Sequence, residues 1–90
     1  MVRRHIQVTG QVQGVGFRWF AKMTASRLGL TGWVRNCPDG SVELEIQGDP
    51  YSVEDFLQAV SQGPGYAQVD QVHTAPRELE DEHSFRVVGY

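Results

Sequence analysis

Helical and strand-like apolar spacings alternate along this chain, and their order restricts the fold more than any single motif. Apolar residues recur at every second position over 6–9 and 42–47, which predicts half-buried strands. They recur at every third or fourth position over 17–28 and 53–60, which predicts two amphipathic helices. The segment 31–36 is rich in β-forming residues and predicts another strand after the first helix.

The end of the chain carries less regular strand patterns. A strand is predicted over 66–74, where Val69 and Val72 break the period of two and indicate a bulge. Phe85 and Val87 mark a short last strand. The order β-α-β-β-α-β with an extra short C-terminal strand is typical of the ferredoxin-like split βαβ fold. We therefore expect an α+β sandwich in which two helices cover one face of an antiparallel sheet.

Turn and capping residues fall between these segments. Gly29 is placed to end the first helix, and residues 38–40, Pro-Asp-Gly, are placed to form a hairpin turn. Asp49 and Pro50 are residue types preferred at an N-cap and at the first helical position. These positions predict the same boundaries as the apolar spacing does.

Length and composition favour a single unit. Ninety residues with 40% hydrophobic content suffice for one core, so residues 1–90 are expected to form one domain. The sole cysteine, Cys37, cannot form an internal disulfide and favours a reducing compartment. The sequence has no apolar run of about 18 residues and no apolar region of a signal peptide. We expect a cytoplasmic monomer without a membrane partner.

Positive charge is concentrated in the first part of the chain. Residues 1–38 contain no Asp or Glu, whereas 39–90 contain all eleven acidic residues. A local positive field attracts anions even on a protein of net charge −3, so an anion site is favoured in residues 1–38. The alternative is a chance segregation that folding mixes again. The basic side chains concerned are Arg3, Arg4, Arg18, Lys22, Arg27 and Arg35.

A glycine-rich segment joins the first predicted strand to the first helix. Gly10, Gly14 and Gly16 allow the backbone to curl and turn several N–H groups inward, beside the unpaired N–H groups of the new helix. Arg18 follows in the first helical turn, where its guanidinium can close on a phosphate or carboxylate. The spacing is neither a Walker A motif nor a Rossmann fingerprint. An anion cradle and a flexible connection with an exposed arginine both remain possible at this point.

The expected topology places Asn36 beside this segment, because the first two strands run in the same direction and end at one edge of the sheet. Residues 10–18, together with 32–36 and 39–40, resemble two motifs of the acylphosphatase family at the family's spacing. The resemblance extends over almost the whole chain, as far as residues 85–87.

This resemblance implies hydrolysis of the carboxyl–phosphate bond of acyl phosphates, without a metal ion or other cofactor. It implies that Arg18 binds the phosphate and that Asn36 positions the attacking water, which makes them the catalytic residues. Inorganic phosphate or sulfate is then a competing anion. Cys37 stands where the family often has a hydroxyl-bearing residue. The backbone amides implied to bind the phosphoryl oxygens belong to Gln13, Gly14, Val15, Gly16 and Phe17.

The residue types are consistent with this chemistry. The conjugate acid of the leaving carboxylate has a pKa of about 4, so the departing oxygen needs no general acid. Positioning and charge stabilisation remain, and backbone amides with one arginine can supply both. The neutral amide of Asn36 can orient water but cannot accept a proton. We therefore expect an oxygen of the substrate's own phosphate to take the proton.

Two other functions are compatible with the same fold. RNA-recognition modules carry basic and aromatic residues on their third strand. Here Glu43, Glu45 and Gln47 are expected to face outward and repel phosphate, so no nucleic-acid partner is predicted. A non-catalytic anion-binding domain is the second alternative, because acylphosphatase-like domains also occur as modules of larger carbamoyl-transfer proteins. The presence of both Arg18 and Asn36 favours catalysis.

The remaining chemistry-bearing residues are interpreted as structural. The three histidines do not have the spacing of zinc ligands. The acidic run 80–82 is expected to form a solvated connection. Trp19 and Trp33 are expected to pack in the core or at its rim rather than to stack on a substrate.

Overall fold

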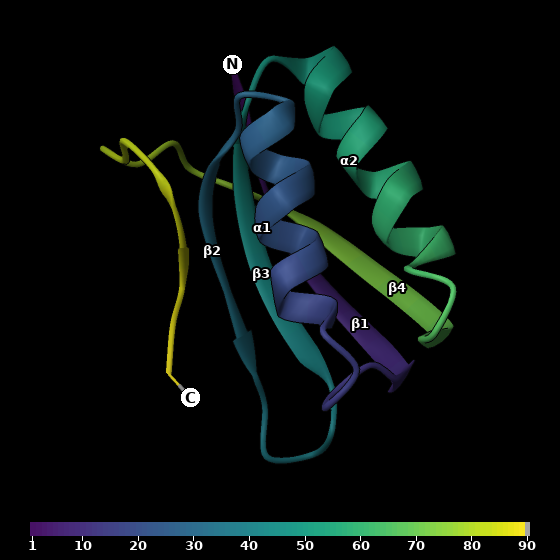
Figure 1. Cartoon of the computed structure of the whole chain (residues 1–90). Coiled ribbons are helices and arrows are strands. Elements are labelled where there is room, and N and C mark those ends of the chain that lie inside the picture. Colours follow the sequence, from purple (N-terminus) through teal and green to yellow (C-terminus); the bar gives the residue numbers. More distant parts are fainter. Residues whose placement is uncertain (90) are drawn as a thin grey trace.

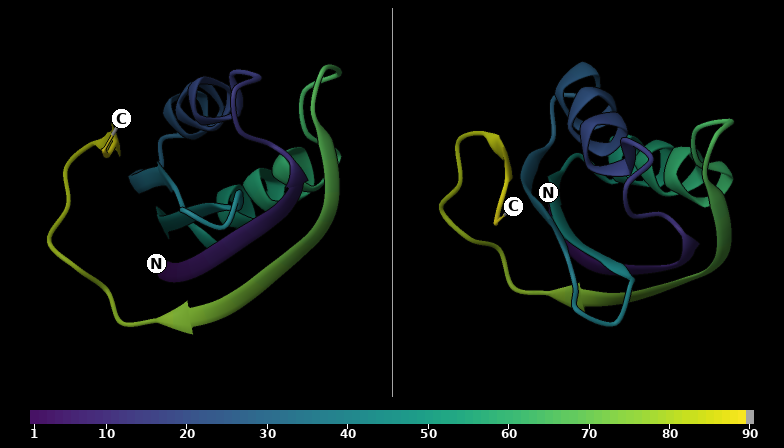
Figure 2. Two further views of the ribbon diagram at one scale, coloured as in Figure 1. Left: turned by 90° about the horizontal axis from the view of Figure 1, so that it is seen from below. Right: turned by 60° about the horizontal axis from the view of Figure 1, so that its bottom comes forward.

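The computed structural model describes residues 1–89, which form a five-stranded sheet with two helices on one face (Figure 1). The elements are β1 Val2–Gln11, α1 Phe17–Arg27, β2 Thr31–Asn36, β3 Val42–Gly48, α2 Pro50–Gln62, β4 Gln68–Arg77 and β5 Phe85–Val87. The strands lie in the order β4-β1-β3-β2-β5. Figure 2 shows both helices on the same side of the twisted sheet.

The predicted fold class is confirmed, with one addition at the edge of the sheet. Strand β1 pairs antiparallel with β3 and β4, and β2 pairs antiparallel with β3. Strand β5 pairs parallel with β2, so the sheet is mixed rather than wholly antiparallel. Strands β1 and β2 therefore run in the same direction, as the expected topology requires.

The hydrophobic core lies between the sheet and the helices. Val42, Leu44 and Ile46 of β3 are fully buried. They alternate with Glu43 and Glu45 on the opposite face, as the period of two predicts. Each helix buries one stripe against the sheet, which confirms the helical spacing. The buried helical residues are Phe17, Ala21, Thr24 and Ala25 of α1, and Val53, Phe56 and Val60 of α2.

The predicted capping residues set the helix boundaries. The side chain of Asp49 accepts hydrogen bonds from the backbone N–H groups two and three residues further on, at 3.1 and 3.2 Å, and Pro50 begins α2. After α1, Gly29 has a φ of 71°, and the N–H of Leu30 donates to the carbonyl of Ala25 at 2.9 Å. Within residues 1–89, no helix is long and apolar enough to cross a membrane.

Strand β4 differs from the predicted strand over 66–74. It spans Gln68–Arg77, because its pairing continues along nearly the whole length of β1. The predicted bulge is confirmed by a register shift between Thr9 and Gly10. Gly10 therefore lies within β1 and not in the loop that follows it. Its φ is 127°, and a side chain there would collide with the carbonyl oxygen of Gln68.

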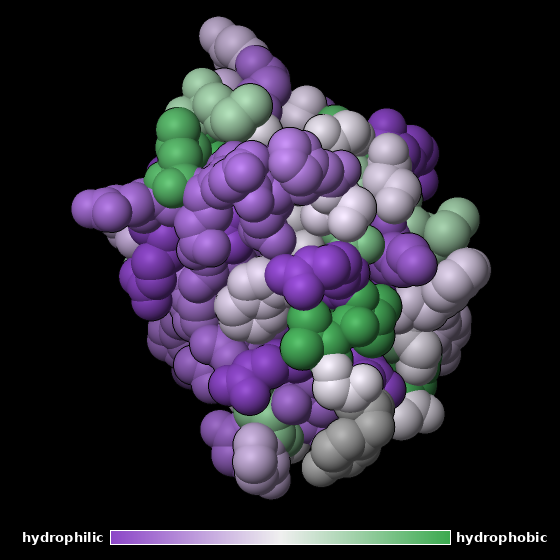
Figure 3. All heavy atoms as spheres, turned by 90° about the vertical axis from the view of Figure 1, so that its left-hand side faces the viewer, coloured by the Kyte–Doolittle hydropathy of each residue, from purple (hydrophilic) through white to green (hydrophobic). Residues whose placement is uncertain are grey.

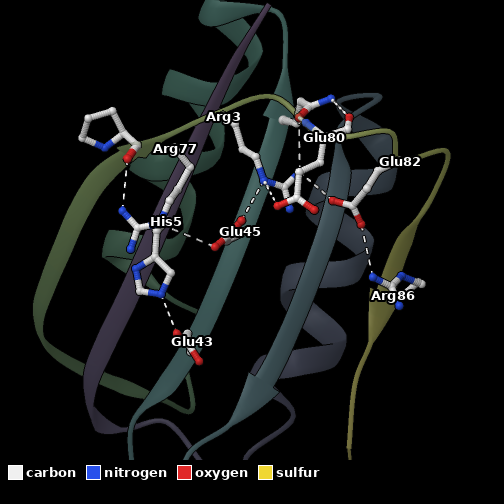
Figure 4. A network of polar contacts seen from close by, with 10 residues as sticks. Arg3, His5, Glu43, Glu45, Arg77, Glu80, Glu82 and Arg86 are labelled. Carbon is white, nitrogen blue, oxygen red and sulfur yellow. Dashed lines mark hydrogen bonds and ion pairs between the residues drawn. The ribbon is translucent and has the colours of Figure 1, made fainter.

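Ion pairs cover the sheet face opposite the helices (Figure 4). The fully buried side chain of Arg3 donates a hydrogen bond to Glu45 at 2.7 Å and lies 2.6 Å from Glu82. Arg35 is bound to Glu43 at 2.6 Å. Folding therefore mixes part of the segregated charge, because Arg3 and Arg35 pair with acidic residues from the second half of the chain. The carboxylates of β3 do face away from the helices, but these cations neutralise them.

This network buries two polar groups that were expected in solvent. The side chain of Glu82 is only 10% exposed, so the prediction of a solvated connection at 80–82 is wrong for this residue. Gln47 is buried, and its side-chain amide exchanges hydrogen bonds of 2.8 and 2.9 Å with the backbone of Glu80. The physical reason is Arg3, because a buried guanidinium has to be paired and draws this connection against the sheet.

Candidate active site

The segment between β1 and α1 is a curled loop that depends on glycine. Gly14 and Gly16 have φ values of 73° and 77°, in the left-handed region, where other residues pay about 1–2 kcal/mol. A Cβ atom at Gly14 would meet no atom of the described residues within 4 Å. Backbone conformation, and not crowding, therefore accounts for glycine at this position.

The loop ends at the N-terminus of α1. Gly16 is the N-cap, so no side chain from that position caps the helix, and the first turn contains no acidic residue. The carbonyl of Gly16 accepts the first helical hydrogen bond from the N–H of Phe20 at 3.0 Å. The N–H groups at this end carry the positive pole of the helix dipole. An anion next to Arg18 would therefore face a favourable field.

The side chain of Gln13 ties this loop to the turn between β2 and β3. Its Nε2 donates hydrogen bonds to the carbonyl oxygens of Cys37 at 2.7 Å and Ser41 at 2.8 Å. Figure 1 shows the loop and the turn at the same end of the molecule. Sequence reasoning missed this role, because the partners lie 24 and 28 residues away and no local pattern marks them. Val15, in the same loop, packs against the hydrophobic core.

The turn itself is held by internal hydrogen bonds. Asp39 Oδ1 accepts from the hydroxyl of Ser41 at 2.6 Å and from its backbone N–H at 2.9 Å, and these bonds lower the pKa of Asp39. The N–H of Cys37 donates to the carbonyl of Ser41 at 2.8 Å, and its Sγ lies 4.0 Å from a carboxylate oxygen of Glu43. The turn is thus a firm support for the end of β2, where Asn36 is the last residue.

A pocket of about 280 Å³ lies where these segments meet. Its lining includes Gly14, Gly16, Arg18 and Asn36, so the structure brings together residues that are distant in the sequence. The volume is near the lower end of small-molecule sites, about 300–1,000 Å³. Asn36 Oδ1 is buried and has no hydrogen-bond partner within residues 1–89. Leaving a buried acceptor unpaired costs about 1–3 kcal/mol, a cost that a donor on a bound molecule would remove.

Four apolar residues complete the lining of this pocket: the buried Val12 and Phe17, and the exposed Trp19 and Val87. Trp19 is 61% exposed, so the core position, one of the two positions predicted for it, is wrong. It follows the buried Phe17 by two helical positions, which places it about 200° around the helix axis, away from the core. Val87 reaches the pocket from β5 and was missed by sequence reasoning. Trp33 is partly buried in β2, as expected.

None of the three histidines lines this pocket, and each has a different polar partner. His5 pairs with Glu43 at 2.5 Å, and His83 lies 3.2 Å from Asp81. His73 contacts a neighbouring glutamine side chain at 3.1 Å. In the part of the chain that the structure describes, no three His, Cys, Asp or Glu side chains are placed to hold a metal ion.

Comparison with known proteins identifies the family. The acylphosphatase family model matches residues 4–87 of this chain. The chain belongs to the acylphosphatase family. The acylphosphatase of Thermococcus kodakarensis is 49% identical over 88 residues, covering 98% of this chain and 97% of that protein. The acylphosphatase of Bifidobacterium longum is 50% identical over 82 residues, covering 91% of this chain and 84% of that protein.

Solved structures give the same assignment. The crystal structure of acylphosphatase from Bacillus subtilis matches with a TM-score of 0.96 at 39% identity, and it covers 99% of this chain and 100% of that chain. Full-length HypF matches with a TM-score of 0.87 at 27% identity, but only 12% of that chain is covered. The predicted family and activity are confirmed: the protein is an acylphosphatase enzyme, and its substrates are acyl phosphates.

Proposed function

We propose that this acylphosphatase holds the phosphoryl group of its substrate in the pocket between the β1–α1 loop and the end of β2. The backbone N–H groups of residues 13–17 bind phosphoryl oxygens, and the guanidinium of Arg18 closes on the same group. Asn36 orients the water molecule that attacks phosphorus. The proposal is supported by the lining of the pocket, which combines loop glycines with Arg18 and Asn36.

The observation that carries this proposal is the state of the Asn36 side chain. Its Oδ1 is buried without a partner among the described residues, in a pocket that also contains Arg18. A water molecule that donates one hydrogen to this oxygen keeps a lone pair for the phosphorus atom. Because a neutral amide does not take up a proton, a phosphate oxygen of the substrate accepts the proton of the attacking water.

The proposed reaction needs neither a metal ion nor an organic cofactor. The bond between phosphorus and the carboxylate oxygen breaks, and a bond between phosphorus and the water oxygen forms. The leaving carboxylate is the base of an acid with a pKa of about 4, so it departs without protonation. Charge spreads over the phosphoryl oxygens in a loose transition state, where amides and Arg18 stabilise it. Inorganic phosphate and sulfate share this anionic geometry and are expected to compete with the substrate.

We further propose that the enzyme acts as a monomer in the cytoplasm. All the residues proposed for the site come from one chain, so catalysis needs no second subunit. The only cysteine, Cys37, is a free thiol, as is usual in a reducing compartment. A nucleic-acid partner is not proposed, because the outer face of β3 carries paired carboxylates.

The test compares hydrolysis of benzoyl phosphate, in the presence of EDTA, by the wild type, Arg18→Ala and Arg27→Ala. Arg27 is an exposed arginine in the last turn of the same helix and serves as the matched control. We expect metal-independent turnover, a loss of about 100-fold or more in kcat/KM for Arg18→Ala, and weaker inhibition by phosphate in that variant alone. Unchanged inhibition by phosphate in Arg18→Ala would show that Arg18 does not bind the phosphoryl group.

A further inference from the structure

Trp19 is a large aromatic residue that the fold leaves exposed to solvent. Its side chain is 61% exposed although it lies in the first turn of a helix that packs on the sheet. Among the described residues, the aromatic ring contacts join Phe17 to Phe20 and Phe56 to Phe85, and Trp19 takes part in neither. Its position is instead the rim of the pocket that contains Arg18 and Asn36.

Val87 reaches the same pocket from a different element. It is 42% exposed and lies in the edge strand β5, which hydrogen bonds to β2 hold at both of its ends. The N–H of Gly32 donates to the carbonyl of Ser84 at 3.1 Å, and the N–H of Val88 donates to the carbonyl of Val34 at 2.8 Å. Figure 3 shows the side of the molecule along β5 as largely hydrophilic, with small, separated hydrophobic patches.

The direction of a bound acyl phosphate connects these two residues. This inference rests on the function proposed above, in which the loop and Arg18 hold the phosphoryl end of the substrate. The acyl end then has to extend toward the rim of the pocket. We infer that Trp19 and Val87 form the subsite for the acyl group, so that the enzyme favours aromatic and larger apolar acyl phosphates over acetyl phosphate. A ring can stack on the indole and contact the valine, whereas a single methyl group offers little surface to either.

The test measures the ratio of kcat/KM for benzoyl phosphate to kcat/KM for acetyl phosphate. In Trp19→Ala we expect this ratio to fall about threefold to tenfold, the size of one lost aromatic contact. Trp19→Phe keeps a ring and should retain most of the ratio. Met23→Ala is the matched control, because Met23 is another exposed apolar residue of α1, 51% exposed, that does not line the pocket. This control should keep the wild-type ratio.

The possible results separate this inference from the function on which it rests. An equal loss for both substrates in Trp19→Ala would overturn the acyl subsite and make Trp19 a support of the loop. Full activity of Trp19→Ala toward both substrates would overturn it as well. Inhibition by phosphate distinguishes the two proposals, since it depends on Arg18 and the loop. If phosphate inhibits the wild type and Trp19→Ala equally while the ratio falls, both proposals are supported.

Discussion

Replacing Arg3 with methionine tests how strongly one buried charge holds the end of the chain in place. The Arg3 side chain donates hydrogen bonds to Glu45 at 2.7 Å and to Gln47 at 3.2 Å, and it lies 2.6 Å from Glu82 (Figure 4). Glu82 belongs to the connection that leads from β4 into β5. Because β5 carries Val87 to the pocket, this network supports one wall of the active site.

The expected loss follows from the burial of the partners. Removing one partner of a buried ion pair costs about 3–5 kcal/mol, because the remaining charge stays unpaired away from water. Glu45 and Glu82 are 12% and 10% exposed, and each keeps a second, more exposed partner: Arg77 lies 3.8 Å from Glu45 and Arg86 lies 3.2 Å from Glu82. Nη2 of Arg3 has no hydrogen-bond partner within residues 1–89, so no bond is lost there. We therefore expect the low end of the range, about 3 kcal/mol.

Urea denaturation followed by circular dichroism measures the free energy of unfolding directly. Arg3→Met should lower it by about 3 kcal/mol. The matched control is Arg77→Ala, which removes the half-exposed partner of the same glutamate and should cost less than about 1 kcal/mol. Equal losses in the two variants, or a loss below about 1 kcal/mol in Arg3→Met, would refute the reasoning.

Three further perturbations act on single contacts. Asn36→Ala should lower kcat about 100-fold, while inhibition by phosphate changes little; steady-state kinetics measures both. If the variant loses both catalysis and inhibition by phosphate, Asn36 supports the loop instead of orienting the water. Gly16→Ala should destabilise the fold by about 1–2 kcal/mol, because alanine is strained in the left-handed backbone conformation of this position. Crowding adds nothing, since the new Cβ would make only an ordinary contact at 3.6 Å. Thermal melting measures the loss, and an unchanged melting temperature would contradict this prediction. Partial burial raises the pKa of Glu43, but hydrogen bonds from His5 and Arg35 outweigh this effect, so the folded pKa is lowered. Glu43 therefore contributes its full stabilisation at pH values above its unfolded pKa of about 4.3. This contribution is lost as the pH falls through the folded pKa. The stability difference between wild type and Glu43→Gln should shrink in that acid range, and a constant difference would contradict the assignment.

Local patterns made the strands and helices predictable. Val42, Leu44 and Ile46 alternate with polar residues because one face of β3 is buried, and such an alternation is visible in a short window. Asp49 and Pro50 predict the start of α2 from the sequence alone, because helix capping involves only residues within one turn of each other. The exposure of Trp19 could also have been predicted, since position 19 lies off the stripe that buries α1.

Contacts between distant residues account for what could not be predicted. The loop glycines and Arg18 are neighbours in the sequence, and the topology brings Asn36 to them. In contrast, Gln13 acts through partners 24 and 28 residues away. Arg3 is one of six Lys and Arg residues within residues 1–38, and no local pattern distinguishes it from the others. Its burial follows from the pairing of β1 with β3, which places Glu45 and Gln47 within its reach. No local pattern reports such a register.

Titration of the ¹⁵N-labelled protein with inorganic phosphate, followed by NMR, tests the central claim most directly. The account predicts that the largest amide shifts occur at residues 13–18 and at the side-chain amide of Asn36, and that Arg18→Ala weakens binding. It would be contradicted if the largest shifts arose beside Arg35 and Arg86, in the surface hollow that Trp33 and Glu43 also line, while residues 13–18 stayed unchanged.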